Sequence, residues 1–139
     1  MTAFVLDASV AVRWCIDSQR TPYSDAVLAA LKDGQALVPS VFPLEVLQAL
    51  LRAERDLGLV EAKTRSFLDD LLLLPIEVRS HDLAVVLGPI QLFARKAAIS
   101  TYDASYLELA QRIRFAMATE DEVLRKAARK VGVSLFDAA

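Results

Sequence analysis

Short runs of apolar residues recur along the chain and divide it into segments of two kinds. The run Ala3 to Leu6 is apolar at every position, and Ala36 to Val38 is a second run of the same type. Such runs are typical of parallel strands that are covered on both faces. Ile76 to Arg79, Phe115 to Ala118 and a short segment near Ser134 to Phe136 are predicted as further strands.

Segments with helical start and stop signals lie between these strands. The predicted helices are Val10 to Ile16, Thr21 to Gly34, Ser40 to Leu57, Val60 to Leu74, one that Ser80 caps and Gly88-Pro89 bends, one that begins at Ser100, and Thr119 to Gly132. Gly34, Gly58 and Gly132 stand just past helix ends, where a left-handed residue is needed. The alternation predicts a three-layer α/β/α domain with a mainly parallel central sheet.

The composition indicates one folded domain. With 139 residues and 55% hydrophobic residues, the chain is long enough to bury a core, and residues 1–139 are predicted to form a single domain. One cysteine, Cys15, excludes an internal disulfide, and together with the one histidine, His81, it leaves no Cys/His zinc cluster. The longest apolar run, near Leu71 to Ile76, is too short for a membrane span, so we expect a soluble, cytoplasmic protein.

The charge balance gives no general sign of nucleic-acid binding. The chain has 16 basic and 18 acidic residues, a net charge of -2, so any phosphate contact must come from a local patch. Candidates for such contacts are Arg13, Arg52, Arg55, Arg95 and Lys96. A charged residue on a helix is more often simply solvated, and that interpretation ranks higher for each of them.

Four carboxylates stand out by their positions. Asp7 and Asp121 each follow a predicted strand, and ligands of parallel sheets bind beyond the carboxyl ends of strands. Glu45 is the only charged residue between Pro39 and Leu51, so its helix offers little polar face on which it could be merely solvated. Asp103 lies in the first turn of a predicted helix with apolar neighbours.

Each of these acids also has a structural interpretation. Asp7 could cap the following helix, and Glu45 could simply point to water. Ser100 and Thr119 each open a capping-box pattern, which would make Asp103 and Asp121 routine acids of a first helical turn. Considered one at a time, none of the four decides between structure and function.

The four carboxylates together indicate a divalent cation. Mg²⁺ and Mn²⁺ prefer oxygen donors and keep several waters, and no histidine accompanies this set. Two carboxylates about 6 Å apart repel by about 3 kcal/mol at an effective dielectric constant near 20, so a cluster without a cation would be unfavourable. A cation held there could bridge a phosphodiester, activate a water and neutralise charge on the phosphorus oxygens.

Four segments carry a resemblance to a known family: FVLDASVAVRW, VPSVFPLEVLQAL, AISTYDASYLELA and MATEDEVLRKAARKVGV. In order and spacing, over nearly the whole chain, they resemble a PIN-domain ribonuclease, and specifically the VapC-type toxins of type II toxin–antitoxin pairs. The resemblance implies a PIN-like fold and a Mg²⁺- or Mn²⁺-dependent endoribonuclease that hydrolyses RNA phosphodiester bonds. The metal would be surrounded by Asp7, Glu45, Asp103 and Asp121.

Charge and geometry lead to a mechanistic hypothesis for the four acids. Asp7 and Asp103 would hold the principal metal, and Glu45 would position it or orient the attacking water. Asp121 would complete the shell, directly or through water. Hydrolysis would proceed by in-line attack of an activated water on the phosphodiester.

Neighbouring positions match the family in part. Ser9 and Thr119 match the small polar positions that assist the acidic set. Asp121 is chosen over the two glutamates beside it because of its spacing from Thr119 and Leu124. Gln48 stands where many relatives carry Asn, which is a departure in the hydrogen bonding around the acids and not in the acids themselves.

The resemblance also implies two protein partners. These are a cognate antitoxin, which wraps part of the chain and inserts a residue near the acids, and a second copy of the chain in a homodimer. Trp14, Phe42, Phe67 and the run Leu71 to Leu74 offer apolar surface on which a partner helix could pack. Core packing is the simpler explanation for most of them.

Other functions are less consistent with the sequence. It contains no G-x-S-x-G and no Walker loop, and His81 is expected in the first turn of a helix rather than in a catalytic pair. A haloacid-dehalogenase phosphatase needs a second aspartate where Ser9 stands, and a receiver-like role for Asp7 lacks a suitably placed lysine. Two alternatives stay open: a PIN-like binding protein that has lost catalysis and acts only in a complex, and, less favoured, a DNA-directed flap-type nuclease.

Overall fold

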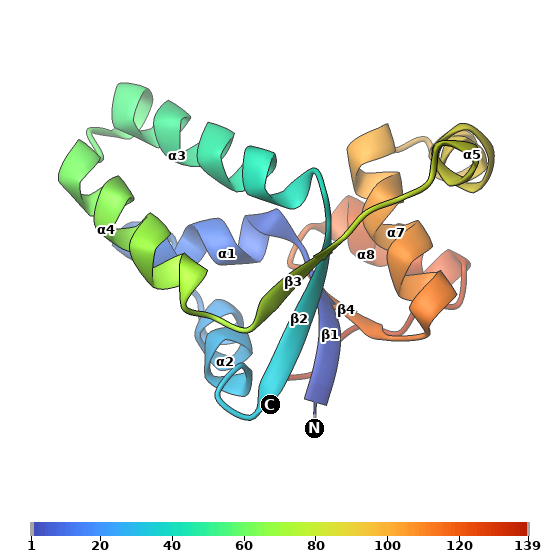
Figure 1. The fold of residues 1–139 in the computed structure, drawn as a ribbon, viewed down its shortest axis with the longest axis horizontal. Coiled ribbons are helices and arrows are strands. Elements are labelled where there is room, and N and C mark those ends of the chain that lie inside the picture. Colours follow the sequence, from blue (N-terminus) through green and yellow to red (C-terminus); the bar gives the residue numbers. More distant parts are fainter. Residues whose placement is uncertain (1, 139) are drawn as a thin grey trace.

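A four-stranded parallel sheet forms the centre of the protein, whose computed structural model describes residues 2–138. The strands are β1 (Thr2–Leu6), β2 (Gly34–Pro39), β3 (Ile76–Arg79) and β4 (Ala116–Ala118). They lie in the order β3-β2-β1-β4, and all three pairings are parallel. Helices flank both faces of the sheet (Figure 1), so the predicted three-layer α/β/α architecture is confirmed.

The helices divide into two groups, one on each side of the sheet (Figure 1). The first group is α1 (Ala8–Cys15), α2 (Pro22–Ala30), α3 (Phe42–Leu57) and α4 (Glu61–Leu72), with a short 3₁₀ turn, η1 (Asp17–Gln19), after α1. The second group contains α7 (Thr101–Ile113), α8 (Glu122–Lys130) and a helical segment made of α5 (Leu83–Val85), η2 (Val86–Ile90) and α6 (Gln91–Ala97).

Strand β1 is an inner strand of the sheet, between β2 and β4, and its last three residues are fully buried. These residues, Phe4, Val5 and Leu6, are buried as expected for a strand that is covered on both faces. Leu6 lies opposite Ala118 of β4, so the two strands end side by side. The residues that follow them therefore leave the same edge of the sheet at neighbouring places.

Two of the three predicted left-handed glycines have that conformation. Gly58 has φ +71° and Gly132 has φ +77°. The prediction for Gly34 is wrong, because α2 ends earlier and Gly34 is the first residue of β2. A β-carbon at this position would lie 2.6 Å from the Thr2 carbonyl oxygen and 2.7 Å from that of Ala30. Gly34 is required by a close approach of backbones.

Some predicted boundaries also differ from the structure. The helical segment after β3 has Asp82 as its N-cap instead of Ser80, and it bends through a π-helical turn around Pro89, which has no N–H to donate. The segment predicted as a last strand makes only one parallel bridge, between Leu135 and Met117. Through this bridge the C-terminal segment covers the outer edge of β4.

The core contains several residues for which the sequence allowed either a structural or a functional role. Cys15 is buried, as predicted, and so are Trp14 and Phe42, which are therefore unavailable as partner surface. His81 lies just before α5 and not in its first turn, and its Nε2 is 2.9 Å from Oε1 of the buried Glu108. Both the cysteine and the histidine are thus part of the packing.

Among the helices of residues 2–138, none is by itself long and apolar enough to cross a membrane. The segments Leu83–Ala97 and Thr101–Ile113 meet the length and composition requirements only as a pair, and the chain bends by 112° between them.

The close approach at Gly34 predicts a specific effect on stability. Gly34→Ala should lower the free energy of unfolding by about 1–3 kcal/mol, because the added methyl group overlaps two backbone oxygens. Gly88→Ala is the matched control, since nothing lies within 4 Å of the added carbon. Urea denaturation of both variants measures the difference. Equal stability of the two variants would show that the backbones at Gly34 move apart easily.

Candidate functional site

Four carboxylates line one hollow of about 330 Å³ beyond the carboxyl ends of β1 and β4. We call it the acid hollow; its carboxylates are Asp7, Glu45, Asp103 and Asp121. Each comes from the N-terminal end of a different helix, namely α1, α3, α7 and α8. The partial positive charge of a helix N-terminus favours a nearby anion, so this placement reduces the cost of gathering the four charges.

Asp7 is held in place by two hydroxyl groups. Its carboxylate is buried, and Oδ2 accepts hydrogen bonds from Ser9 Oγ at 2.6 Å and from Thr119 Oγ1 at 2.7 Å. Asp7 occupies the N-cap position of α1, but its side chain makes no capping hydrogen bond. Burial raises the pKa of Asp7, and the two hydroxyl donors partly oppose that rise. Since both hydroxyls bind Oδ2, neither of them occupies Oδ1.

Glu45 is fixed by a residue from the opposite side of the hollow. Its Oε1 accepts a hydrogen bond of 2.7 Å from the hydroxyl of Tyr106, which is fully buried in α7. Burial raises the pKa of Glu45, the Tyr106 bond lowers it, and the charge of Asp7 raises it again. Glu45 therefore does not simply point to water. From the sequence, Tyr106 could be identified only as a buried neighbour of Asp103, and not as the hydrogen-bond donor to Glu45.

Asp103 combines both of the roles considered for it. Its backbone N–H donates to Ser100 Oγ at 3.0 Å, so Ser100 caps α7 as predicted. The carboxylate itself makes no such bond and faces the acid hollow. Burial and the charges of the other three acids raise its pKa from 3.8 to about 6. Burial is the largest cause of this rise in pKa, and repulsion by each of the other three acids adds to it.

Asp121 is the N-cap of α8, and the capping box predicted to begin at Thr119 is wrong. Oδ1 of Asp121 accepts from the Leu124 N–H at 2.9 Å, while its own N–H donates to Thr119 Oγ1 at 3.1 Å. Thr119 is thus occupied by Asp7 and by the Asp121 backbone. Of the neighbouring glutamates, Glu120 accepts a hydrogen bond of 2.6 Å from Thr21 Oγ1 and does not line the acid hollow.

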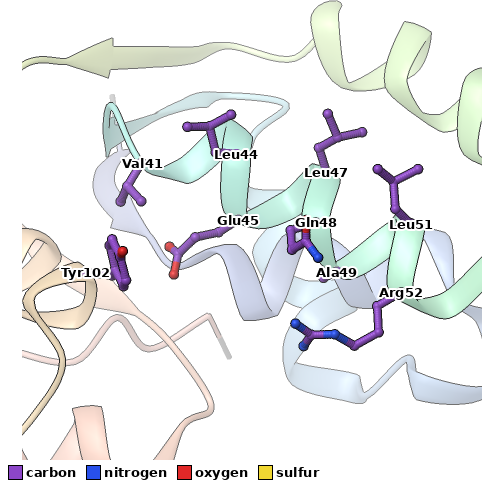
Figure 2. A pocket seen from close by; sticks show the side chains of 9 residues that line it. All are labelled: Val41, Leu44, Glu45, Leu47, Gln48, Ala49, Leu51, Arg52 and Tyr102. Atoms are coloured by element: carbon purple, nitrogen blue, oxygen red, sulfur yellow. The ribbon is translucent and has the colours of Figure 1, made fainter. Parts of the chain in front are cut away.

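Arg13 is the one basic residue among those that line the acid hollow. Its Nη1 donates to the Gln19 carbonyl at 3.0 Å, and its Nε lies 3.6 Å from Glu120 Oε1. Arg52 lines an adjoining hollow, beside Gln48 (Figure 2). The other three cations considered in the sequence, Arg55, Arg95 and Lys96, line neither hollow.

The donor set fits a hard divalent cation. Carboxylate oxygens are the ligands that Mg²⁺ and Mn²⁺ prefer, and Mg²⁺ is usually held by one or two carboxylates with several waters. Within residues 2–138, no group of three or more Asp, Glu, His or Cys side chains has the geometry of a complete metal site. A cation held in the acid hollow as it stands would therefore take fewer than three ligands from these side chains and the rest from water.

The raised pKa of Asp103 predicts how the stability of the metal-free protein depends on pH. The folded state keeps this proton up to about pH 6, whereas the unfolded chain loses it near 3.8. The folded state thus binds more protons between these values, so the free energy of unfolding falls as the pH rises through this window. Thermal unfolding in EDTA should show this fall, and Asp103→Asn should reduce it and raise the melting temperature at pH 7.

The control for this experiment is Asp69→Asn, which removes an exposed carboxylate from α4. It should keep the pH dependence of the unmodified protein. A melting temperature of Asp103→Asn that is below that of the unmodified protein at pH 7 would contradict the proposed repulsion.

A family model and several solved structures match this chain. The PIN domain model matches residues 4–130. PAE2754 from Pyrobaculum aerophilum is 20% identical, with a TM-score of 0.68 over 91% of this chain and 84% of that one. VapBC2 from Rickettsia felis, solved bound to a DNA fragment from their promoter, is 14% identical, with a TM-score of 0.68 over 97% and 98%. FitAcB from Neisseria gonorrhoeae is 20% identical, with a TM-score of 0.61 over 97% of both chains.

At these identities the structural matches show a shared fold and no more. No curated protein matches the chain in sequence. The family model covers most of the chain and includes all four carboxylates of the acid hollow. The resemblance found in the four sequence segments is therefore confirmed at the level of the family: the chain belongs to the PIN domain family.

Proposed function

We propose that this protein is a Mg²⁺- or Mn²⁺-dependent endoribonuclease, the toxin of a cytoplasmic toxin–antitoxin pair, built as one PIN domain over residues 1–139. The observation that carries the proposal is the acid hollow, in which four carboxylates from four helices face one another. Repulsion of this kind has a functional explanation if a cation neutralises it. The family assignment and the shared fold with VapBC2 support the same conclusion.

Each residue of the acid hollow has a distinct task in this proposal. Asp7 and Asp103 hold the principal metal, and Asp121 completes its shell directly or through water. Glu45, with one oxygen fixed by Tyr106, keeps the other free to orient the attacking water. When bound, the metal supplies a Lewis acid that polarises the phosphoryl group and lowers the pKa of water.

Ser9, Thr119 and Arg13 support these groups. The two hydroxyls hold the Asp7 carboxylate in place through Oδ2, so that it could serve as a ligand of the cation. Arg13 lies at the wall of the acid hollow and is braced by the Gln19 carbonyl and by Glu120. A braced guanidinium beside carboxylates is well placed to contact a phosphate of the substrate.

Removing the carboxylate of Asp7 tests the nuclease proposal. Purified protein without antitoxin should cut mixed cellular RNA at discrete positions in Mg²⁺ or Mn²⁺, and the cuts should disappear in EDTA and with Asp7→Asn. The variant should also lose the rise in melting temperature that Mn²⁺ gives the unmodified protein, because it lacks a ligand. Without metal it should be at least as stable, because one buried charge is gone.

The control for Asp7→Asn is Asp69→Asn, on the surface of α4. It should cut RNA and bind Mn²⁺ like the unmodified protein. Cleavage by Asp7→Asn would remove Asp7 from its assigned role. Metal binding without any cleavage of RNA would instead favour the binding-only alternative, and cleavage of DNA flaps alone would favour the flap-type nuclease.

The proposed partners are a cognate antitoxin and, in a homodimer, a second copy of the chain. VapBC2 shares the fold of this chain, and the resemblance to VapC-type toxins implies an antitoxin. A suitable surface for its apolar helix is the leucine stripe, which we define as Leu44, Leu47 and Leu51 on the outer side of α3. These side chains are 68%, 37% and 45% exposed, an arrangement that fits an amphipathic partner helix.

Placing a charge on the leucine stripe tests this surface. Leu44→Asp should prevent co-purification with the co-expressed cognate antitoxin and should release RNA cleavage from inhibition, because the charge is costly to bury. The isolated variant should still cut RNA, because all four carboxylates of the acid hollow are kept. Leu92→Asp, at a 54% exposed position on α6, is the control and should keep both properties. Full inhibition of Leu44→Asp would place the antitoxin elsewhere.

A further inference from the structure

A second hollow adjoins the acid hollow along α3. It has a volume of about 570 Å³, and we call it the side hollow. Glu45 and Ala49 line both hollows, so the two adjoin. The remaining wall comes from Val41 just before α3, from Tyr102 at the start of α7, and from Leu44, Leu47, Gln48, Leu51 and Arg52 of α3 itself. A strand that leaves the acid hollow along α3 would therefore enter the side hollow.

Tyr102 presents an aromatic ring at this junction. It directly precedes Asp103 and is 59% exposed, although a tyrosine ring gains from burial. Within residues 2–138, neither its ring nor its hydroxyl makes a hydrogen bond or an aromatic contact. Figure 2 shows the ring beside the Glu45 carboxylate. An exposed ring at this place has no evident role in the stability of the fold.

The part of α3 that lines the side hollow has both polar and apolar residues. Glu45, Gln48 and Arg52 follow one another at helical spacing, and the leucine stripe lines the same hollow beside them (Figure 2). Arg52 makes no hydrogen bond or ion pair with any part of the described chain. Gln48 and Arg52 are thus a free amide and a free cation on the path that leads out of the acid hollow.

We propose that Tyr102 and Arg52 form a subsite for single-stranded RNA, in which the ring stacks on an unpaired base and the guanidinium contacts a phosphate farther along. The proposal rests on the nuclease function proposed above. An aromatic ring and an uncommitted arginine that line one hollow are a combination by which proteins bind single strands. The leucine stripe lines the same hollow, so an antitoxin helix seated on the stripe would cover the RNA subsite.

This subsite predicts which RNA segments the protein should bind. Stacking accepts any base, because every base has an aromatic face, but it requires a base that is free of its own helix. The protein should therefore select unpaired segments next to the cleaved bond, with little preference for their sequence at this position.

Equilibrium binding of a fluorescein-labelled, short single-stranded RNA oligonucleotide tests the subsite. The Asp7→Asn protein is the parent, since it should bind without cutting. Adding Tyr102→Ala should weaken binding about 5- to 150-fold, which corresponds to the loss of one base–aromatic stack of about 1–3 kcal/mol. Tyr102→Phe keeps the ring and should bind like the parent, and Leu92→Ala, at an exposed position on α6, is the remote control.

An abasic oligonucleotide of the same length separates stacking from a structural effect. Without bases there is nothing to stack, so Tyr102→Ala should bind this probe like the parent. Adding Arg52→Ala should weaken binding of both probes and lower the salt dependence of log K by about one, as expected for one phosphate contact.

Three results would overturn the subsite. Equal binding of the RNA by Tyr102→Ala and its parent, with cleavage by the unmodified protein intact, would reject the subsite and leave the nuclease proposal standing. An equal loss for both probes would show that Tyr102 acts through the structure. A change in the sedimentation of Tyr102→Ala would show that a second copy covers the side hollow. Absence of both RNA cleavage by the unmodified protein and RNA binding by the parent would reject the nuclease proposal itself.

Discussion

Repulsion among four carboxylates in one hollow is the constraint on which the rest of this structure depends. Like charges separate unless the fold holds them in place. Here different hydrogen-bond donors hold three of the four carboxylates. Two hydroxyls hold Asp7, a buried tyrosine hydroxyl holds Glu45, and the backbone of α8 holds Asp121. Asp103 has the fewest restraints on its carboxylate, and it is the group whose pKa rises to about 6. The acids thus form a site that is incomplete without positive charge.

The parallel sheet explains why the four carboxylates and the groups that hold them meet at one place. β1 and β4 end in register, so Asp7 and Thr119 leave the sheet side by side and can bond. Helix α7 packs on the same sheet and contributes two residues one turn apart, Asp103 to the acid hollow and Tyr106 to the support of Glu45. One edge of the sheet and the beginnings of four helices therefore supply every part of the site.

Helix α3 illustrates how one element can serve three surroundings. Val46, Leu50 and other residues of one face are buried in the core. Glu45 lines the acid hollow, and Glu45, Arg52 and the leucine stripe line the side hollow. Because a helix repeats every 3.6 residues, the buried face stays separate from these residues along the helix, so a substitution in the lining of a hollow leaves the core intact.

The sequence by itself determined the strands, most helices and the four acids, because apolar runs, caps and charge within an apolar helix are local signals. It did not reveal that Tyr106 binds Glu45, since these residues are far apart in the chain and meet only when α3 and α7 fold toward one another. Nor could it reveal why Gly34 is a glycine, because the crowding there comes from Thr2 and Ala30. Local patterns record what a residue prefers, whereas contacts between distant segments exist only after the chain has packed.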